Sequence, residues 1–206
     1  MARYRGPKAR ICRRFGENIY GAEKYDRILS RKNYAPGVHG KNFARNKSEY
    51  GKQLTMKQKA KYIYGILEKQ FRKHYEDVKN RPGVTGDLLL ARLEQRLDNV
   101  VYRLGFANTR PQARQIVNHS MIHVNGKKMD IPSYEVKVGD EITINPTKKD
   151  NGYFKNQQQY ITNKKRVVSW LTLDNKNMSG KMTALPKRDD FDANINAQII
   201  VEFYSK

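Results

Sequence analysis

The residues suited to acid–base, nucleophilic or metal chemistry are few in this chain, and their spacing matches no catalytic motif. His119 and His123 lie four residues apart, but no glutamate follows His119, as the zinc-binding HExxH helix requires. Neither of the phosphate-binding loop patterns GxxxxGK[ST] and GxGxxG occurs. The acidic run at 189–192 is expected to balance its basic neighbours. We therefore expect no catalytic residue and no metal site.

Cys12 is the single cysteine, so an intramolecular disulfide is excluded and a reducing cytoplasm fits the chain. The nearest histidine in sequence is His39, so a structural zinc site is not expected either. Neighbouring cations would lower the pKa of the Cys12 thiol, but we expect it to be an incidental small side chain. We expect no cofactor and no small-molecule substrate.

The charge of the chain points to a polyanionic partner. Lys and Arg number 41 against 20 Asp and Glu, a formal net charge of +21. Residues 1–92 carry 23 basic and 8 acidic side chains, and residues 93–206 carry 18 and 12. An excess concentrated in one half favours nucleic acid over a merely solubilising surface. No apolar run approaches the ~20 residues of a membrane span, and the N-terminus lacks the apolar core of a secretory signal, so we expect no membrane partner.

Residues 1–47 are predicted to form an extended basic arm. The first acidic residue is Glu17, and Gly6-Pro7 and the segment 35–37 should prevent long helices. Aromatic rings among the cations either stack on bases or anchor the arm to the protein's own core, and the sequence leaves both open. These rings are Tyr4, Phe15, Tyr20, Tyr25 and Tyr34.

Apolar spacing predicts a helix over 55–78, opened by a capping box of Thr55 and Gln58. A second helix is predicted over 87–104, with Gly105 after it as a C-terminal cap. Cations of the first helix lie largely off its apolar stripe, which favours phosphate contact. They are Lys57, Lys59, Lys61, Lys69, Arg72 and Lys73.

The segment 93–126 is the most informative in the chain. Its pattern predicts a helix, a loop, a basic helix from Thr109 with a second Thr109–Gln112 capping box, and a β-hairpin turning at Asn125-Gly126. Arg110 and Arg114 are predicted to be exposed, so their alanine variants should weaken RNA binding without unfolding the protein. Such a platform with one cationic face is suited to structured RNA.

Short strands are predicted in the remaining part of the chain. The run 135–144 should give two strands joined by Gly139-Asp140, and 146–166 a surface loop. Residues 170–173 and 182–185 should pair as a hairpin, and 197–204 should form a C-terminal strand or a packed extended segment.

Several of these segments resemble the bacterial small-subunit ribosomal protein four family over essentially the whole chain. The matching segments are MARYRGP at the start, APGVHG at 35–40, IYGILEKQFR at 63–72, residues 93–126, and INAQIIVEFYSK at the end. The segment 93–126 alone is less specific, because similar motifs occur in RNA-modifying enzymes, in a tyrosine-charging synthetase and in a small heat-shock RNA binder.

The resemblance implies an α+β fold with an arm and two lobes. The basic extended arm is residues 1–47, and a mainly helical lobe covers 48–90, with 191–206 packing back onto it. Residues 91–190 would form a small antiparallel sheet domain with helices on one side, carrying the RNA-binding motif at 93–155. Some family members bind zinc through a cysteine cluster in the arm, which does not carry over to a chain with one cysteine.

The resemblance also implies a structural constituent of the small ribosomal subunit. It would bind small-subunit rRNA at a helix junction in the 5′ region, nucleate assembly, contact small-subunit protein five, contribute to translational accuracy and help line the mRNA channel. The expected rRNA-binding residues are Arg3, Arg5, Lys8, Arg13, Arg14, Lys57, Lys59, Lys61, Arg72, Lys73, Arg110, Arg114, Gln115, Asn118, His119, Asn125 and Lys127. The nearest matches to the family's mRNA-channel cations are Lys41, Arg45 and Lys47.

Two alternatives share the RNA-binding motif. An RNA-modifying enzyme would need a separate catalytic domain, and the segments around the motif leave no room for one. A free RNA chaperone or translational regulator would bind RNAs outside the ribosome, and the sequence does not separate that role from a ribosomal one.

Overall fold

The computed structural model describes residues 3–42, 47–149, 151–154, 156, 168–175, 177–192 and 194–205. The chain divides into two compact units, one formed by residues 1–86 with 193–206 and the other by residues 87–192. Helices dominate the first unit, and the second combines helices with an antiparallel sheet. The predicted α+β class is therefore confirmed.

The N-terminal segment is helical rather than extended. It contains α1 (Lys8–Phe15), α2 (Glu23–Arg31) and the 3₁₀ helix η1 (Val38–Lys41). The helices are short, as expected from the residues that should prevent long ones. Pro7 precedes α1, and Gly16 ends it with a left-handed φ of 72°. Ile11, Cys12 and Tyr25 are buried, so a few well-spaced apolar residues suffice to fold this segment.

The helix predicted over 55–78 is two helices, α3 (Glu49–Tyr64) and α4 (Glu68–Lys79). Gly65 ends α3 in the left-handed conformation at φ 65°, where a glycine carries no steric penalty. The N-cap is Ser48, whose hydroxyl accepts from the Gly51 N–H, and Thr55 lies inside the helix with its hydroxyl donating to the Gly51 carbonyl. The expected Thr55 capping box is therefore wrong.

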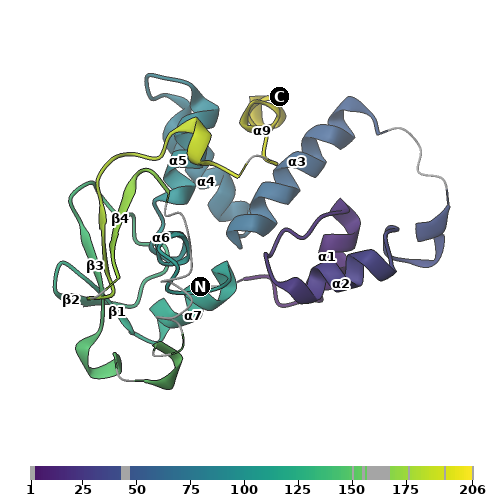
Figure 1. Cartoon of the computed structure of the whole chain (residues 1–206). Helices are drawn as coiled ribbons and strands as arrows, with labels where there is room; N and C mark the ends of the chain where they lie inside the picture. Colours follow the sequence, from purple (N-terminus) through teal and green to yellow (C-terminus); the bar gives the residue numbers. More distant parts are fainter. Residues whose placement is uncertain are drawn as a thin grey trace. The chain divides into compact units, whose positions relative to one another are not determined.

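The C-terminal segment is a helix, α9 (Ala197–Ser205), and not a strand. Its β-branched and aromatic residues imitate a strand pattern, but the Asn196 side chain accepts from the N–H groups of Gln198 and Ile199 and starts a helix. The helix packs on α3, as Figure 1 shows, and the Tyr204 ring stacks on that of Tyr75 at 4.8 Å between centroids.

The helix predicted over 87–104 is interrupted at Gln95-Arg96. It comprises α5 (Thr85–Glu94) and α6 (Leu97–Arg103). The interruption occurs because Arg96 forms a β-bridge with Glu135, and the Leu97 N–H donates to the Tyr134 carbonyl. Gly105 follows α6 with a φ of 87°, as expected of a residue that ends a helix.

Helix α7 (Arg110–Asn118) begins after Thr109, as predicted. Its capping box does not form: the Thr109 side chain makes no capping bond, and the Gln112 amide oxygen accepts from the Asn108 N–H. Pro111 occupies the first turn, where the missing N–H has no helical partner to lose.

Within the described residues, five short strands form one antiparallel sheet in the order β2-β1-β3-β5-β4. They are β1 (Ile122–Val124), β2 (Lys127–Met129), β3 (Glu141–Ile144), β4 (Leu171–Asp174) and β5 (Ser179–Met182). The hairpin at Asn125-Gly126 is confirmed by positive φ values of 51° and 76°. A hairpin also forms in the region predicted for 170–173 and 182–185, but its second strand is Ser179–Met182 and shares only Met182 with the prediction. Residues 135–138 form only the isolated bridge at Glu135 and no strand.

One face of this sheet packs against α6 and α7, which lie on the same side of it in Figure 1. Ile122 pairs with Ile144 and Val124 with Ile142, so their side chains share the buried face. Leu104 packs directly over β5, where a Cβ at Gly180 would lie 2.4 Å from a Leu104 methyl carbon. The 3₁₀ helices η2 (Pro146–Lys148) and η3 (Arg188–Asp190) complete the described elements.

Candidate nucleic-acid interface

The structure divides the expected RNA-binding residues into side chains that hold the fold together and side chains that face solvent. Lys57, Lys59 and Arg114 are buried. Lys8, Arg13, Lys61 and Arg110 are half-buried. The exposed residues are Arg3, Arg5, Arg14, Arg72, Lys73, Gln115, Asn118, His119, Asn125 and Lys127.

Lys57 serves the helical packing. Its ammonium lies 2.7 Å from a Glu68 carboxylate oxygen and 4.4 Å from the centroid of the Phe203 ring. The other Glu68 oxygen is 3.3 Å from Lys61, and the Tyr204 hydroxyl also donates to Glu68. Burial by itself would raise the pKa of Glu68, but these hydrogen bonds and the Lys57 charge outweigh it and hold that pKa below its usual value. Lys57 therefore links α3, α4 and α9.

Lys59 has a similar structural role. Its ammonium donates to Glu17 at 2.7 Å, and the side chain is only 9% exposed. The second Glu17 oxygen accepts from the Asn194 amide. The expectation that α3 presents its cations to phosphate is thus wrong for Lys57 and Lys59, because i, i+4 spacing alone did not reveal the acidic partners supplied by distant segments.

Arg110 belongs to a charged cluster in the second unit. Its guanidinium donates to Asn99 at 2.7 Å and to Asp192 at 2.8 Å, and lies over the Tyr102 ring. Arg103 holds the same Asp192 and the fully buried Glu94. Burial alone would raise the pKa of Asp192, but the two arginines outweigh it and hold that pKa below its ordinary value.

Arg114 is the clearest correction to the sequence analysis. It is 4% exposed and lies 3.4 Å from Asp98, which Arg96 also contacts at 3.1 Å. Neither Arg110 nor Arg114 is an exposed side chain. The predicted exposure of both is therefore wrong, and with it the reason for expecting that both could be replaced without harm to the fold.

Two cations of α1 are partly engaged by the protein. Arg13 donates to the carbonyls of Tyr34 and Ala35 and stacks on the Tyr34 ring. Lys8 lies over the Tyr20 ring, and its pKa is lowered by burial and by nearby positive charge. The Tyr4 ring packs edge-on against Tyr62 at 5.3 Å, so at least part of the aromatic set anchors this segment to the protein.

The solvent side of α7 carries polar side chains free of ion pairs. Gln115 and His119, with Gln112, Ile116, Met121 and Tyr153, line a pocket of about 140 Å³, and Asn118 is exposed. Beyond the turn, Lys127 and Lys128 are exposed. Asn125 instead fixes the turn, since its amide donates to Asp140 and accepts from the Glu141 N–H.

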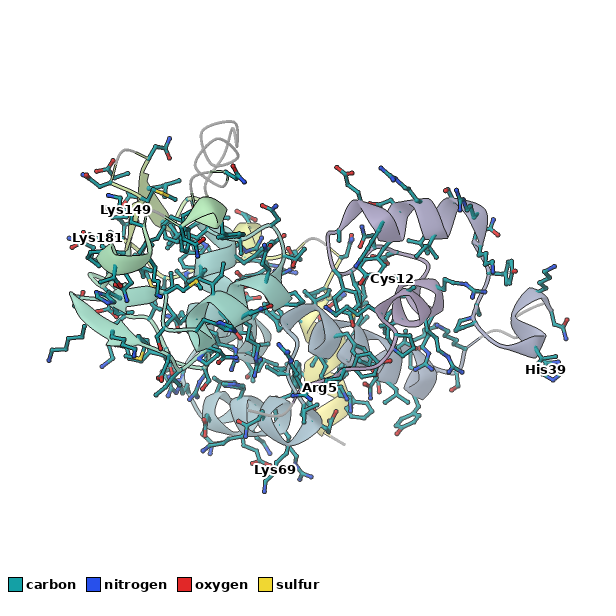
Figure 2. All side chains as sticks on the ribbon, turned by 90° about the horizontal axis from the view of Figure 1, so that it is seen from below. Arg5, Cys12, His39, Lys69, Lys149 and Lys181 are labelled. Carbon is teal, nitrogen blue, oxygen red and sulfur yellow. The ribbon has the colours of Figure 1, made fainter. Side chains whose placement is uncertain are left out.

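Further exposed cations lie outside the set of expected rRNA-binding residues. Figure 2 shows the Lys149 and Lys181 side chains at the periphery of the second unit, and Lys69 on α4. None of these, nor Arg3, Arg5, Arg14, Lys73 or Lys127, makes an ion pair with a residue that the structure describes. Lys148 and Lys149 are adjacent and Lys181 stands alone, so no periodic pattern distinguishes them in the sequence.

The cations matched to the mRNA channel lie near the join of η1 and α3. Lys41 is exposed over the Tyr34 ring at 5.4 Å, and Lys47 is exposed 3.5 Å from the Thr55 hydroxyl. Arg45 falls outside the described residues.

The zinc site of some family members does not fit this chain. The Cys12 side chain, labelled in Figure 2 beside the N-terminal helices, is fully buried, and burial raises the pKa of its thiol. Among the described residues, no three His, Cys, Asp or Glu side chains are grouped as metal ligands. No described helix is long and apolar enough to cross a membrane.

Comparisons with known proteins match the chain throughout. The family model described as ribosomal protein S4/S9 N-terminal domain covers residues 3–94, and the S4 domain covers residues 95–142. The small ribosomal subunit protein uS4 of Chloroflexus aurantiacus is 52% identical over 208 residues, with 100% of both chains covered. The proteins of the same name from Roseiflexus castenholzii and Parabacteroides distasonis are each 50% identical, also with 100% of both chains covered.

Proposed function

The chain belongs to the family of small ribosomal subunit proteins uS4, and we propose that it is a structural constituent of the small subunit that binds small-subunit rRNA directly. The family membership confirms the resemblance found in the sequence. The relatives are named as ribosomal proteins and not as enzymes, in agreement with the absence of a catalytic motif. In this role the protein would reside in the cytoplasm as part of the ribosome.

The observation that carries rRNA binding is the set of exposed cations that make no ion pair with a described residue. In the first unit these include Arg3, Arg5, Arg14 and Lys73. Each contact between such a cation and a phosphate releases condensed counterions from the RNA, which makes binding favourable and strongly dependent on salt. Lys57, Lys59 and Arg114 contribute through the ion pairs that they make inside their own units.

The outer side of α7 would add recognition of RNA shape. Gln115, Asn118 and His119 present hydrogen-bonding groups on α7, and Lys127 is exposed in the hairpin that follows. Amide and imidazole groups can bond both phosphate oxygens and base edges in irregular RNA, where bases are unstacked. This supports a helix junction, rather than a regular duplex, as the target in the 5′ region of the rRNA.

Early binding follows from the same features. Most of the charged clusters are satisfied within each unit, so a preformed protein surface can select one RNA junction geometry before other proteins arrive. We therefore include nucleation of subunit assembly in the proposal. Omission of this protein from a reconstitution should block the binding of later small-subunit proteins, whereas omission of a late-binding protein should not.

Roles in translational accuracy, at the contact with small-subunit protein five and in the mRNA channel rest on the family resemblance. Lys41 and Lys47 support the channel role, because both are exposed cations in the segment that matches it. Replacing both with alanine should reduce crosslinking to mRNA on purified subunits and leave rRNA binding intact. Equal loss of both kinds of binding would assign these lysines to rRNA instead.

The direct test uses the purified chain and a transcript of the rRNA 5′ region. Filter binding over a salt series should give tight binding to this transcript and a steep decline with salt. A structured RNA of equal length and unrelated sequence is the control. Equal affinity for both RNAs would oppose the proposal and favour a general RNA chaperone.

A further inference from the structure

A groove in the first unit is lined by Arg13 and by several cations to which no role has been assigned above. It lies between α1 and α2, which are neighbours in Figure 1, and is closed by the segment that follows α2. Its volume is about 690 Å³, within the range of sites that bind ligands larger than a simple anion.

The lining of the groove is strongly cationic. Arg10 and Arg13 contribute from α1, Arg31 from the end of α2 and Lys32 from the residue after it, and no lining residue is acidic. Arg10, Arg31 and Lys32 are exposed and make no ion pair with any described residue. Four cations around one cavity repel each other in the free protein, and an anionic ligand would reduce this electrostatic repulsion.

The acids of α2 do not neutralise this charge. Glu23 faces Arg27 at 3.9 Å, and Asp26 accepts a hydrogen bond from Asn18. Neither lines the groove. The residues of α2 that do line it, Ile28 and Arg31, are three apart and so share one face of the helix.

Arg13 is held in place in advance. Its Nε and Nη2 donate to the carbonyls of Tyr34 and Ala35 at 3.1 and 3.2 Å, and its guanidinium stacks on the Tyr34 ring at 4.7 Å. Carbonyl partners fix its position without cancelling its charge. Its Nη1 is not used in these bonds and remains available to a phosphate oxygen.

The rest of the lining is apolar. Pro7, Ile28 and Pro36 provide surface against which a ribose or an unstacked base can pack. A groove that combines cations with apolar surface is the arrangement that proteins use for a single nucleic-acid strand. Inorganic phosphate would use only the cations, and a cavity of this volume is too small to enclose a turn of duplex.

We propose that this groove binds a single RNA strand, with phosphates on Arg10, Arg13, Arg31 and Lys32 and sugar or base against Ile28 and the prolines. The inference rests on the proposed rRNA-binding function and adds a strand-binding subsite to it. The subsite belongs to the first unit, in the segment that the sequence indicated to be an extended arm.

The test compares two triple variants that each lose three positive charges. The groove variant is Arg10→Ala, Arg31→Ala and Lys32→Ala, and the control is Lys128→Ala, Lys148→Ala and Lys149→Ala, all exposed in the second unit. Fluorescence anisotropy would measure binding of decauridylate and of a ten-base-pair RNA duplex, with urea midpoints checking that both variants are folded.

The groove variant should bind decauridylate at least 10-fold more weakly than the unaltered protein, and the log–log salt slope should fall by about 2, as expected for three contacts to a single strand. The affinity of the groove variant for the duplex should change less than the affinity of the control variant for the duplex.

Equal effects of the two variants on decauridylate, or competition by inorganic polyphosphate as strong as that by RNA, would overturn the inference. If the groove variant binds decauridylate as tightly as the unaltered protein and still binds the rRNA transcript, the subsite is excluded but the proposed function is not. Failure of the unaltered protein to select the transcript would remove the proposed function itself.

Discussion

The Lys59 ammonium lies 2.7 Å from the Glu17 carboxylate, an ion pair between residues 42 positions apart. Glu17 follows α1 and Lys59 lies on α3, so the pair fastens the N-terminal helices to the helical unit. A lysine in a basic helix thus has a structural partner within the protein. The N-terminal segment makes contacts of its own with the rest of the helical unit.

Replacement of Glu17 by alanine should destabilise the protein. The Lys59 ammonium would remain nearly buried without its acceptor, and Asn194 would lose a partner as well. We expect a loss of about 1–3 kcal/mol in the free energy of unfolding, measured by urea denaturation. The control is Glu23→Ala, which removes the exposed Arg27 pair and should cost less than about 1 kcal/mol. Equal losses would show that the Lys59 pair has no special role.

Replacement of Arg114 by alanine should also act on stability. Asp98 would stay buried with Arg96 as its remaining charged partner. We expect a loss of about 2 kcal/mol in unfolding free energy. Lys127→Ala, at an exposed position of the hairpin, should change stability by less than about 0.5 kcal/mol. A stable Arg114→Ala protein that binds rRNA poorly would contradict this assignment and restore Arg114 as an RNA contact.

Exposed cations should show the opposite behaviour. Arg14→Ala and Lys73→Ala should each weaken binding to the rRNA transcript and lower its log–log salt slope by about 1, because each removes one phosphate contact. Urea midpoints should stay unchanged, since neither side chain makes an ion pair among the described residues. Filter binding at several salt concentrations gives both the affinity for the transcript and the salt slope. A variant with unaltered affinity and slope would exclude its residue from the interface.

The charged cluster around Asp192 predicts a loss of stability in acid. Its pKa is lowered in the folded protein, mainly because Arg110 and Arg103 outweigh the effect of burial. The stabilisation is therefore present above the unfolded value of about 3.9 and is lost as pH falls through the lower, folded value. Asp192→Asn should lower the urea midpoint at pH 7 and flatten its decline below pH 5, whereas the exposed Asp189→Asn should do neither. If the urea midpoint of Asp192→Asn declines below pH 5 as steeply as that of the unaltered protein, other carboxylates cause the acid sensitivity.

Short-range signals in the sequence predicted part of the fold well. The Asn125-Gly126 turn, the start of α7 after Thr109 and the cap at Gly105 all depend on local backbone preferences, which the residues themselves carry. The apolar residues Phe71, Tyr75 and Val78 were placed correctly in the core because their helical spacing is independent of where the helix begins. The prediction of a strand or extended segment at 197–204 was wrong, because packing overrides the strand propensity of its β-branched residues in α9.

The candidate interface was predicted less well, because burial of a charge depends on partners that are distant in sequence. Glu68, Glu17 and Asp98 neutralise Lys57, Lys59 and Arg114, and only the folded chain brings them together. On α7 the prediction of an exposed side chain holds for Gln115 and fails for Arg110 and Arg114, whose acidic partners lie outside the helix. The groove between α1 and α2 could not be foreseen, since that segment was expected to be extended.

The most direct test of the central claim is sedimentation of the endogenous protein in a sucrose gradient, with crosslinking to identify its RNA. We predict comigration with the small ribosomal subunit and crosslinks near the helix junction in the 5′ region of its rRNA. Migration in light fractions with crosslinks to other RNAs would contradict the ribosomal role and indicate a free RNA-binding protein.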